Sequence, residues 1–300
     1  MTVLYEKIKD AYGDVEKMEL PEDNTPEEEN TEPIEPIQAP FPLGYIPDPE
    51  DSRDYKLSEV LSSGQRRDWS YFDYSPEMSE VKDQGAKGAC VGFAVAAMVE
   101  WQQQQEYLKE SEQGNPYTRD KKHYDLSEQW IYHRSREIDG YSNDSGGTTL
   151  RAALKIVNKY GVPPEEGWNY DDHIIGKPKF WSYSTAKWAR SKSYYRIDSI
   201  EEMKDTLVNV GPFVTGVLVF YEFFYPDNNG YIDYPSNTNN YYGGHAICIT
   251  GYDDDRQCFK FKNSWGKNWG KDGYGWLPYN YMRDFSIISW VSIDKDVRGL

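Results

Sequence analysis

Cys90 is the first candidate for chemistry, because it stands between a glycine-rich stretch and a run of small apolar residues in "QGAKGACVGFAVAAMVEW". The residues after it are good helix formers, so we expect a long helix that begins near Val91 with a buried first turn. A thiol becomes a strong nucleophile only after it loses its proton. The free N–H groups and the dipole at a helix N-terminus favour the anionic sulfur. The position of Cys90 therefore indicates a nucleophile that is activated by the helix start and by a neighbouring imidazolium.

His245 is the candidate source of that imidazolium. It begins the apolar run "HAICITGY" directly after two glycines, which allow another group to approach closely. Asn263 follows further along, and its amide oxygen can accept a hydrogen bond from one ring nitrogen and leave the other to face the thiol. The other three histidines lie in polar sequence and are expected at the surface: His123, His133 and His173.

Gln84 precedes Cys90 in the same loop and is a candidate donor to an oxyanion. Its side-chain amide and the Cys90 backbone N–H together would stabilise the negative oxygen of an acyl-transfer intermediate. Two simpler readings stay open at this point. Cys90 is a buried small hydrophobe in the first of them, and Asn263 is only a turn residue in the second.

Several elements must hold these side chains in place. A second helix is predicted in "DLSEQWIYHRSRE", where Ser127 can cap the N-terminus, and a third in "TTLRAALKIVNKY", which Gly161 ends. The polar run Gln102–Gln105 is expected on the solvated face of the first helix. The second half of the chain consists of short β-branched and aromatic runs. Helices first and strands later predict an α+β protein built from two unlike halves.

Three motifs in this order, "QGAKGAC", "GGHAICITGYD" and "NSWGKNWGKDGYGW", resemble the papain-like (cathepsin-type) cysteine protease family from about Arg67 to Val291. The resemblance implies a two-lobe fold, with a helical left lobe, a β-barrel-like right lobe and the active-site cleft between them. It also implies an endopeptidase that hydrolyses peptide bonds through an acyl-enzyme. The implied roles are nucleophile for Cys90, general acid/base for His245, orienting group for Asn263 and oxyanion donor for Gln84.

Three further residues take substrate-binding roles from the resemblance. Gly146 and Gly147 would pair with the backbone of an extended substrate, although a simple turn there stays open, and Trp265 would shield the His–Asn hydrogen bond from water. The chain departs from the family at Lys87, where a disulfide cysteine is usual, and at Val91, where a tryptophan is usual. A non-catalytic peptide-binding protein and an acyl transferase using the same residues remain alternative functions.

Composition limits the partners and the compartment. The formal net charge is −17 over 300 residues, which argues against binding to nucleic acid or to an anionic membrane. Few cysteines and no apparent signal peptide predict a protein of the cytoplasm, or another reducing compartment, in which Cys248 and Cys258 are reduced core thiols. We expect a monomer that acts on polypeptides without a cofactor or a metal.

Residues 1–64 read as an N-terminal extension, and residues 65–300 as the peptidase domain. The extension begins with a possible short amphipathic helix over residues 4–12. The segment Asp14–Glu35 then holds ten acids and one base, a composition that does not order by itself. The proline-rich stretch "EPIEPIQAPFPLGYIPDPEDSRDY" must be extended. We expect part of it to lie in or beside the cleft and to restrain activity, with a tether on the back of the domain, or disorder, as the alternative.

Overall fold

The computed structural model describes residues 39–60, 69–112, 125–141 and 146–294. The predicted helix over residues 4–12 and the acidic segment Asp14–Glu35 lie outside the described residues. No helix in the described part of the chain has the length and apolar character needed to span a lipid bilayer.

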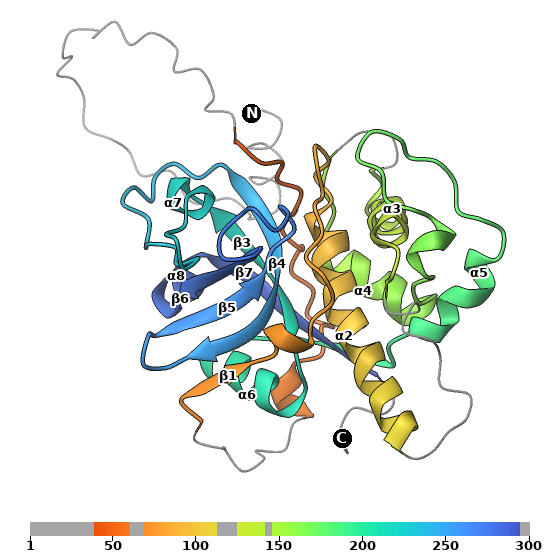
Figure 1. Cartoon of the computed structure of the whole chain (residues 1–300), viewed down its shortest axis with the longest axis horizontal. Coiled ribbons are helices and arrows are strands. Elements are labelled where there is room, and N and C mark those ends of the chain that lie inside the picture. Colours follow the sequence, from red (N-terminus) through yellow and green to blue (C-terminus); the bar gives the residue numbers. More distant parts are fainter. Residues whose placement is uncertain (1–38, 61–68, 113–124, 142–145, 295–300) are drawn as a thin grey trace, which may run out of the picture. The chain divides into compact units, whose positions relative to one another are not determined.

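One half of the described chain is helical (Figure 1). Ser127 accepts a hydrogen bond from the Trp130 N–H, and Thr149 accepts one from the Ala152 N–H, so each caps the helix that follows it. The cap at Ser127 was predicted and is confirmed. The helices and short 3-10 turns of this lobe are α2 (Cys90–Glu112), α3 (Glu128–Asp139), α4 (Leu150–Lys159), η4 (Glu165–Gly167), α5 (Ser182–Thr185) and η5 (Ala186–Ala189).

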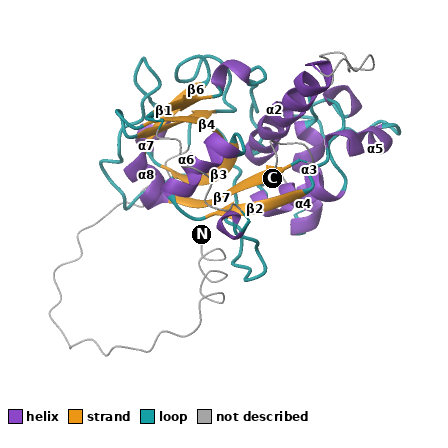
Figure 2. Cartoon of the chain, turned by 90° about the horizontal axis from the view of Figure 1, so that it is seen from below, coloured by secondary structure: helices purple, strands orange, loops and turns teal. Residues whose placement is uncertain are grey.

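The other half is built on a seven-stranded antiparallel sheet with the order β2-β7-β3-β4-β5-β6, in which β1 pairs with β4. Figures 1 and 2 show this sheet beside the helical lobe, with α6, α7 and α8 on the side of the strands. The strands are β1 (Tyr71–Asp73), β2 (Ser193–Ile197), β3 (Phe213–Val219), β4 (Gly243–Asp253), β5 (Cys258–Lys262), β6 (Tyr274–Pro278) and β7 (Ser286–Ile293). The remaining helices and turns are η1 (Leu57–Glu59), η2 (Ser75–Glu77), α6 (Ile200–Asn209), α7 (Tyr221–Phe224) and α8 (Tyr279–Phe285).

A helical lobe beside an antiparallel sheet confirms the predicted α+β class. One apolar core lies mainly within the sheet half, and a second packs the helices against strands β3, β4 and β7. Cys248 and Cys258 lie on the paired strands β4 and β5 as buried free thiols, as expected. The expectation for Gln102–Gln105 was wrong for its first two residues. Gln102 and Gln103 are buried, because Gln102 donates to the Ser292 carbonyl at 2.7 Å and Gln103 bonds to Asp294. Their amides link α2 to the end of β7 across the two lobes.

Residues 39–56 form an extended segment, here called the strap, that runs over both lobes. Prolines recur through it and exclude a helix. Tyr45 makes backbone bridges to Thr148 of the helical lobe and to Gly244 of β4. Further along, Lys56 forms a parallel bridge with Arg196 on β2.

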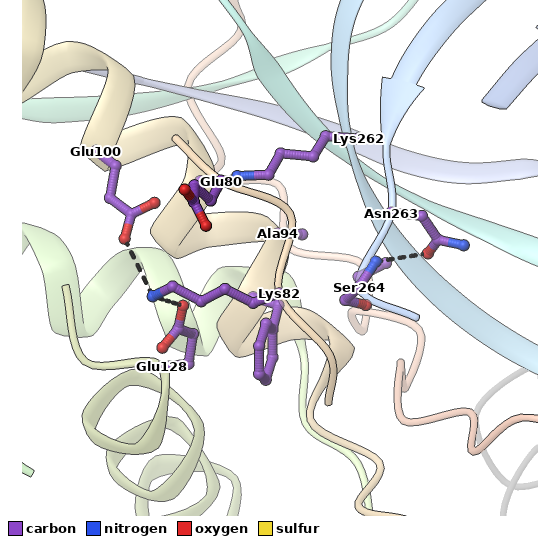
Figure 3. A pocket seen from close by; sticks show the side chains of 11 residues that line it. Glu80, Lys82, Ala94, Glu100, Glu128, Lys262, Asn263 and Ser264 are labelled. Carbon is purple, nitrogen blue, oxygen red and sulfur yellow. Dashed lines mark hydrogen bonds and ion pairs between the residues drawn. The ribbon is translucent and has the colours of Figure 1, made fainter. Parts of the chain in front are cut away.

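An ion network ties Lys82, in the loop that leads to Cys90, to buried carboxylates on α2 and α3 (Figure 3). The Lys82 ammonium lies 2.5 Å from a carboxylate oxygen of Glu128 and 3.5 Å from one of Glu100, and both carboxylates are only 2% exposed. Burial opposes the charge of Lys82, but the two carboxylates together raise its pKa. A small pocket lies between these groups and the Asn263–Ser264 turn. The network therefore fixes the Cys90 loop between the lobes.

We predict that Lys82→Met destabilises the protein by about 3–5 kcal/mol, because it removes the ammonium that pairs with the buried carboxylates of Glu100 and Glu128. The free energy of unfolding in urea measures this. Lys267→Met is the matched control, since Lys267 and its partner Glu80 are both exposed and the pair should contribute little. Equal losses in the two variants would contradict the role given to the network.

Candidate active site

Cys90 is the first residue of α2, as the sequence predicted. The loop before it turns at Gly85, whose φ of +57° favours glycine. The Ala246 N–H of β4 donates to the Cys90 sulfur at 3.4 Å, and this contact brings the sulfur to the residue that follows His245. The start of α2 and the start of β4 therefore meet at the thiol.

His245 and Asn263 form the expected pair. The His245 Nε2 lies 2.8 Å from the Asn263 Oδ1, which also accepts the Ser264 N–H at 2.8 Å. Because this oxygen can only accept, Nε2 is the nitrogen that carries the proton. Within the described residues, the other ring nitrogen, Nδ1, is buried and has no hydrogen-bond partner. The pair therefore presents an unprotonated nitrogen that is free to act as a base.

Trp265 covers this pair. Its ring stacks on the His245 ring with 4.4 Å between centroids, and it is 3% exposed. Phe41 of the strap stacks on the Trp265 ring at 4.5 Å. Water is thus kept from the His245–Asn263 hydrogen bond by aromatic rings, one of which belongs to the strap.

Gln84 lies next to the same turn. Its side-chain oxygen accepts from the Ser264 Oγ at 2.6 Å, and its backbone N–H donates to the Ser264 carbonyl at 2.9 Å. Its side-chain nitrogen donates to the carbonyl oxygens of Lys87, at 2.9 Å, and of Pro42, at 3.0 Å. Pro42 belongs to the strap. A carbonyl oxygen of the strap therefore already accepts from the Gln84 side chain, which the sequence predicts to be the oxyanion donor.

The strap backbone seats directly on the site. The Gly44 carbonyl accepts the Thr148 N–H at 3.0 Å, the Ile46 N–H donates to the Thr148 carbonyl at 3.0 Å, and the Tyr45 N–H donates to the Gly244 carbonyl at 3.1 Å. A Cβ built on Gly147 would lie 2.0 Å from the Gly44 carbonyl oxygen. Glycine at position 147 is therefore needed for the backbones to approach this closely.

Of the two predicted glycines, Gly147 lies against the strap, whereas Gly146 accepts a hydrogen bond from the Tyr132 hydroxyl. Thr148 and Gly244 supply the backbone groups that pair with the strap, and neither was predicted as a site residue. Backbone hydrogen bonding does not require a particular residue type, so the neighbouring glycines were the only sequence signal for this pairing.

Burial opposes the ionised state that the sequence predicts for the thiol and the imidazole. Cys90 and His245 are both fully buried. Burial raises the pKa of Cys90 to about 11, although backbone N–H groups of Ala246 and Gly44 oppose the shift. Burial lowers the pKa of His245 to about 4, although the bond to Asn263 opposes it. Burial therefore favours the neutral form of both groups in this structure.

A metal has no evident place in the described site. Among the residues that the structure describes, no three His, Cys, Asp or Glu side chains are grouped so as to hold a metal ion.

Comparison with known proteins places the chain in a family. The family model described as papain family cysteine protease matches residues 64–293. An uncharacterized peptidase C1-like protein of Acanthamoeba polyphaga mimivirus is 33% identical over 228 residues, which cover 71% of this chain and 69% of that protein. Cathepsin K of Gallus gallus is 28% identical over 237 residues, which cover 76% of this chain and 63% of cathepsin K.

A solved structure gives the same assignment for the fold. Xylellain, a cysteine protease from Xylella fastidiosa, superposes with a TM-score of 0.69 at 28% identity, covering 85% of this chain and 97% of that chain. The sequence match and this likeness confirm the resemblance drawn from the motifs around Cys90, His245 and Asn263. The chain therefore belongs to the papain family of cysteine proteases.

Proposed function

We propose that this chain is a cysteine endopeptidase whose nucleophile is Cys90 and whose activity is restrained by its strap. The observation that carries the proposal is the contact between the Cys90 sulfur, at the α2 N-terminus, and the N–H of Ala246, the residue that follows His245 of the hydrogen-bonded pair His245–Asn263. The family assignment supports the same chemistry. We also propose a reducing compartment for the protein, which its three free thiols favour.

The first half of the reaction forms an acyl-enzyme. Once water and substrate replace the strap, the proton of Cys90 passes to Nδ1 of His245, because solvation stabilises both charges. The sulfur forms a bond to the substrate carbonyl carbon, and the oxyanion accepts hydrogen bonds from the Gln84 amide and the Cys90 N–H. The C–N bond then breaks, and the imidazolium gives its proton to the leaving amine.

The second half releases the acid. His245 takes a proton from water as the water oxygen attacks the acyl carbon, and the C–S bond breaks. In both halves of the reaction, the hydrogen bond from His245 Nε2 to Asn263 orients the ring so that Nδ1 can face the sulfur. Trp265 keeps water from this hydrogen bond. Asn263 is therefore a positioning residue rather than a base.

Three contacts support restraint by the strap. The Pro42 carbonyl accepts from the proposed oxyanion donor Gln84, and the Gly44 N–H points at the Cys90 sulfur. Tyr45 is 4% exposed and fills space between the lobes. A substrate must displace all three before its own carbonyl reaches the thiol.

We expect Cys90→Ala to abolish hydrolysis of a fluorogenic peptide and to leave the fold intact, since alanine keeps the helix start and removes only the sulfur. Turnover is measured together with circular dichroism. Hydrolysis that persists in a folded Cys90→Ala protein would refute the assignment of the nucleophile.

We expect His245→Ala to lower kcat by a factor on the order of 10²–10⁴, because proton transfer is lost. Asn263→Ala should lower kcat less, because it removes only the orientation of the ring. Asn239→Ala, at an exposed asparagine, is the control and should be unchanged. A larger loss for Asn263→Ala than for His245→Ala would contradict the roles.

We expect Gly44→Ala to raise peptide hydrolysis by the full-length chain about tenfold or more. A Cβ on Gly44 would lie 1.8 Å from the Gly88 carbonyl oxygen, and a backbone clash of this kind weakens the strap by at least about 1–3 kcal/mol. Glu50→Ala, at an exposed position of the strap, is the control and should be unchanged. Equal rates for wild type and Gly44→Ala would argue that the strap does not restrain the enzyme.

A further inference from the structure

Arg151 is a buried cation whose bonded carboxylates come from the strap. Its guanidinium is 7% exposed and forms two parallel hydrogen bonds with Asp54, from Nε to Oδ1 at 3.0 Å and from Nη2 to Oδ2 at 2.6 Å. Its backbone N–H donates to the Asp48 Oδ1 at 2.9 Å. Both carboxylates leave when the strap leaves, and among the described residues no other ion pair of Arg151 is seen.

The donors around Arg151 are built to receive carboxylates. The Trp290 Nε1 donates to the second Asp48 oxygen at 3.2 Å, so one carboxylate is held by an indole N–H and a backbone N–H. The guanidinium packs 5.6 Å from the Trp290 ring centroid, which limits its freedom. The planar guanidinium can form two parallel hydrogen bonds with a carboxylate. Among the side chains of a peptide substrate, Asp and Glu therefore fit it best.

This group of donors lies on the path of the strap over the site. Arg151 is in the first turn of α4, shortly after Thr148, whose backbone pairs with Gly44 and Ile46 of the strap. Tyr45, beside Cys90 in the same core, lies within electrostatic range of both Asp48 and Arg151. An extended peptide that replaces the strap over Cys90 therefore passes Arg151.

We propose that Arg151, with its backbone N–H and the Trp290 Nε1, is a carboxylate-binding site that the strap fills in the closed protein and that an acidic substrate side chain fills in the open one. Arg151 would then determine specificity for peptides with Asp or Glu near the scissile bond. The inference rests on the proposed peptidase function and names its substrate class. When the strap leaves, the guanidinium loses the two parallel hydrogen bonds to Asp54, and a substrate carboxylate can restore them.

The overall charge of −17 makes this preference a sharp test. The field of an acidic protein repels acidic peptides, so any preference for them must come from a local cation. Without the Arg151 charge, kcat/KM for acidic peptides should be equal to or lower than kcat/KM for neutral peptides.

The experiment measures kcat/KM for fluorogenic peptides in which one Asp is moved through the positions around the cleaved bond, each compared with its Asn counterpart. The Asp/Asn ratio does not depend on how often the strap is open, because both peptides meet the same enzyme population. We expect a ratio of about ten at one position for the full-length wild type. Arg151→Gln should lower it to one or less, and Arg151→Lys should keep part of it, since lysine retains the charge but not the fork.

Asp54→Asn is the matched control for the strap side of the contact. It should raise kcat/KM for both peptides equally, because it loosens the strap, and leave their ratio unchanged. An Asp/Asn ratio below two at every position in the wild type would overturn the inference, and so would a wild-type ratio that persists in Arg151→Gln. In either case, hydrolysis of the neutral peptides would still support the peptidase function.

Loss of the peptidase function itself would look different, since no peptide would be cleaved by any variant. Fluorescence polarisation then compares binding of the same Asp and Asn peptides to full-length Gly44→Ala protein and to its Arg151→Gln derivative. Tighter binding of an Asp peptide that depends on Arg151 supports the site, and equal binding of the two peptides overturns it.

Discussion

The exclusion of water from one thiol and one imidazole is the constraint on which the rest of the structure depends. Cys90 and His245 belong to different lobes, and each is fully buried under the same length of backbone. Burial favours the neutral form of both, which opposes the ionised pair that the proposed chemistry requires. The His245–Asn263 hydrogen bond is intact in the same structure, so the proposed restraint would act through burial rather than through distortion of the pair.

Close approach of backbone to backbone makes this cover possible. A Cβ on Gly44 would clash with the Gly88 backbone and a Cβ on Gly147 with the Gly44 backbone, and the strap bonds to both lobes through main-chain groups. Main-chain bonding suits a segment that must occupy the place of peptides of varied sequence. Side chains then anchor it at either end, with Phe41 on Trp265 and Asp54 on Arg151. The segment is therefore held by an aromatic contact on one side of the thiol and an ionic contact on the other.

Much of the fold and of the candidate site could be predicted from local sequence patterns. The cap at Ser127, the helix that begins at Cys90 and the pairing of His245 with Asn263 follow from residue type and order, and the α+β class follows from the order of helices and strands. The features that failed depend on tertiary burial. Gln102 and Gln103 look like a solvated face until the end of β7 covers them. At Cys90, burial raises the pKa of the thiol and so opposes the effect of the helix N-terminus, although backbone N–H groups point at the sulfur. Thr148 and Gly244 act through their backbones, which no residue type reveals.

We therefore propose that the ionisation of Cys90 depends on the strap as well as on the catalytic residues. The most direct measurement is the rate of Cys90 alkylation by iodoacetamide as a function of pH, followed by mass spectrometry of the full-length protein. We predict that wild type reacts slowly at neutral pH and that its rate rises only toward a pKa of about 11, whereas Gly44→Ala reacts readily at neutral pH. Rapid alkylation of the wild type at neutral pH, with the same profile in Gly44→Ala, would contradict the account.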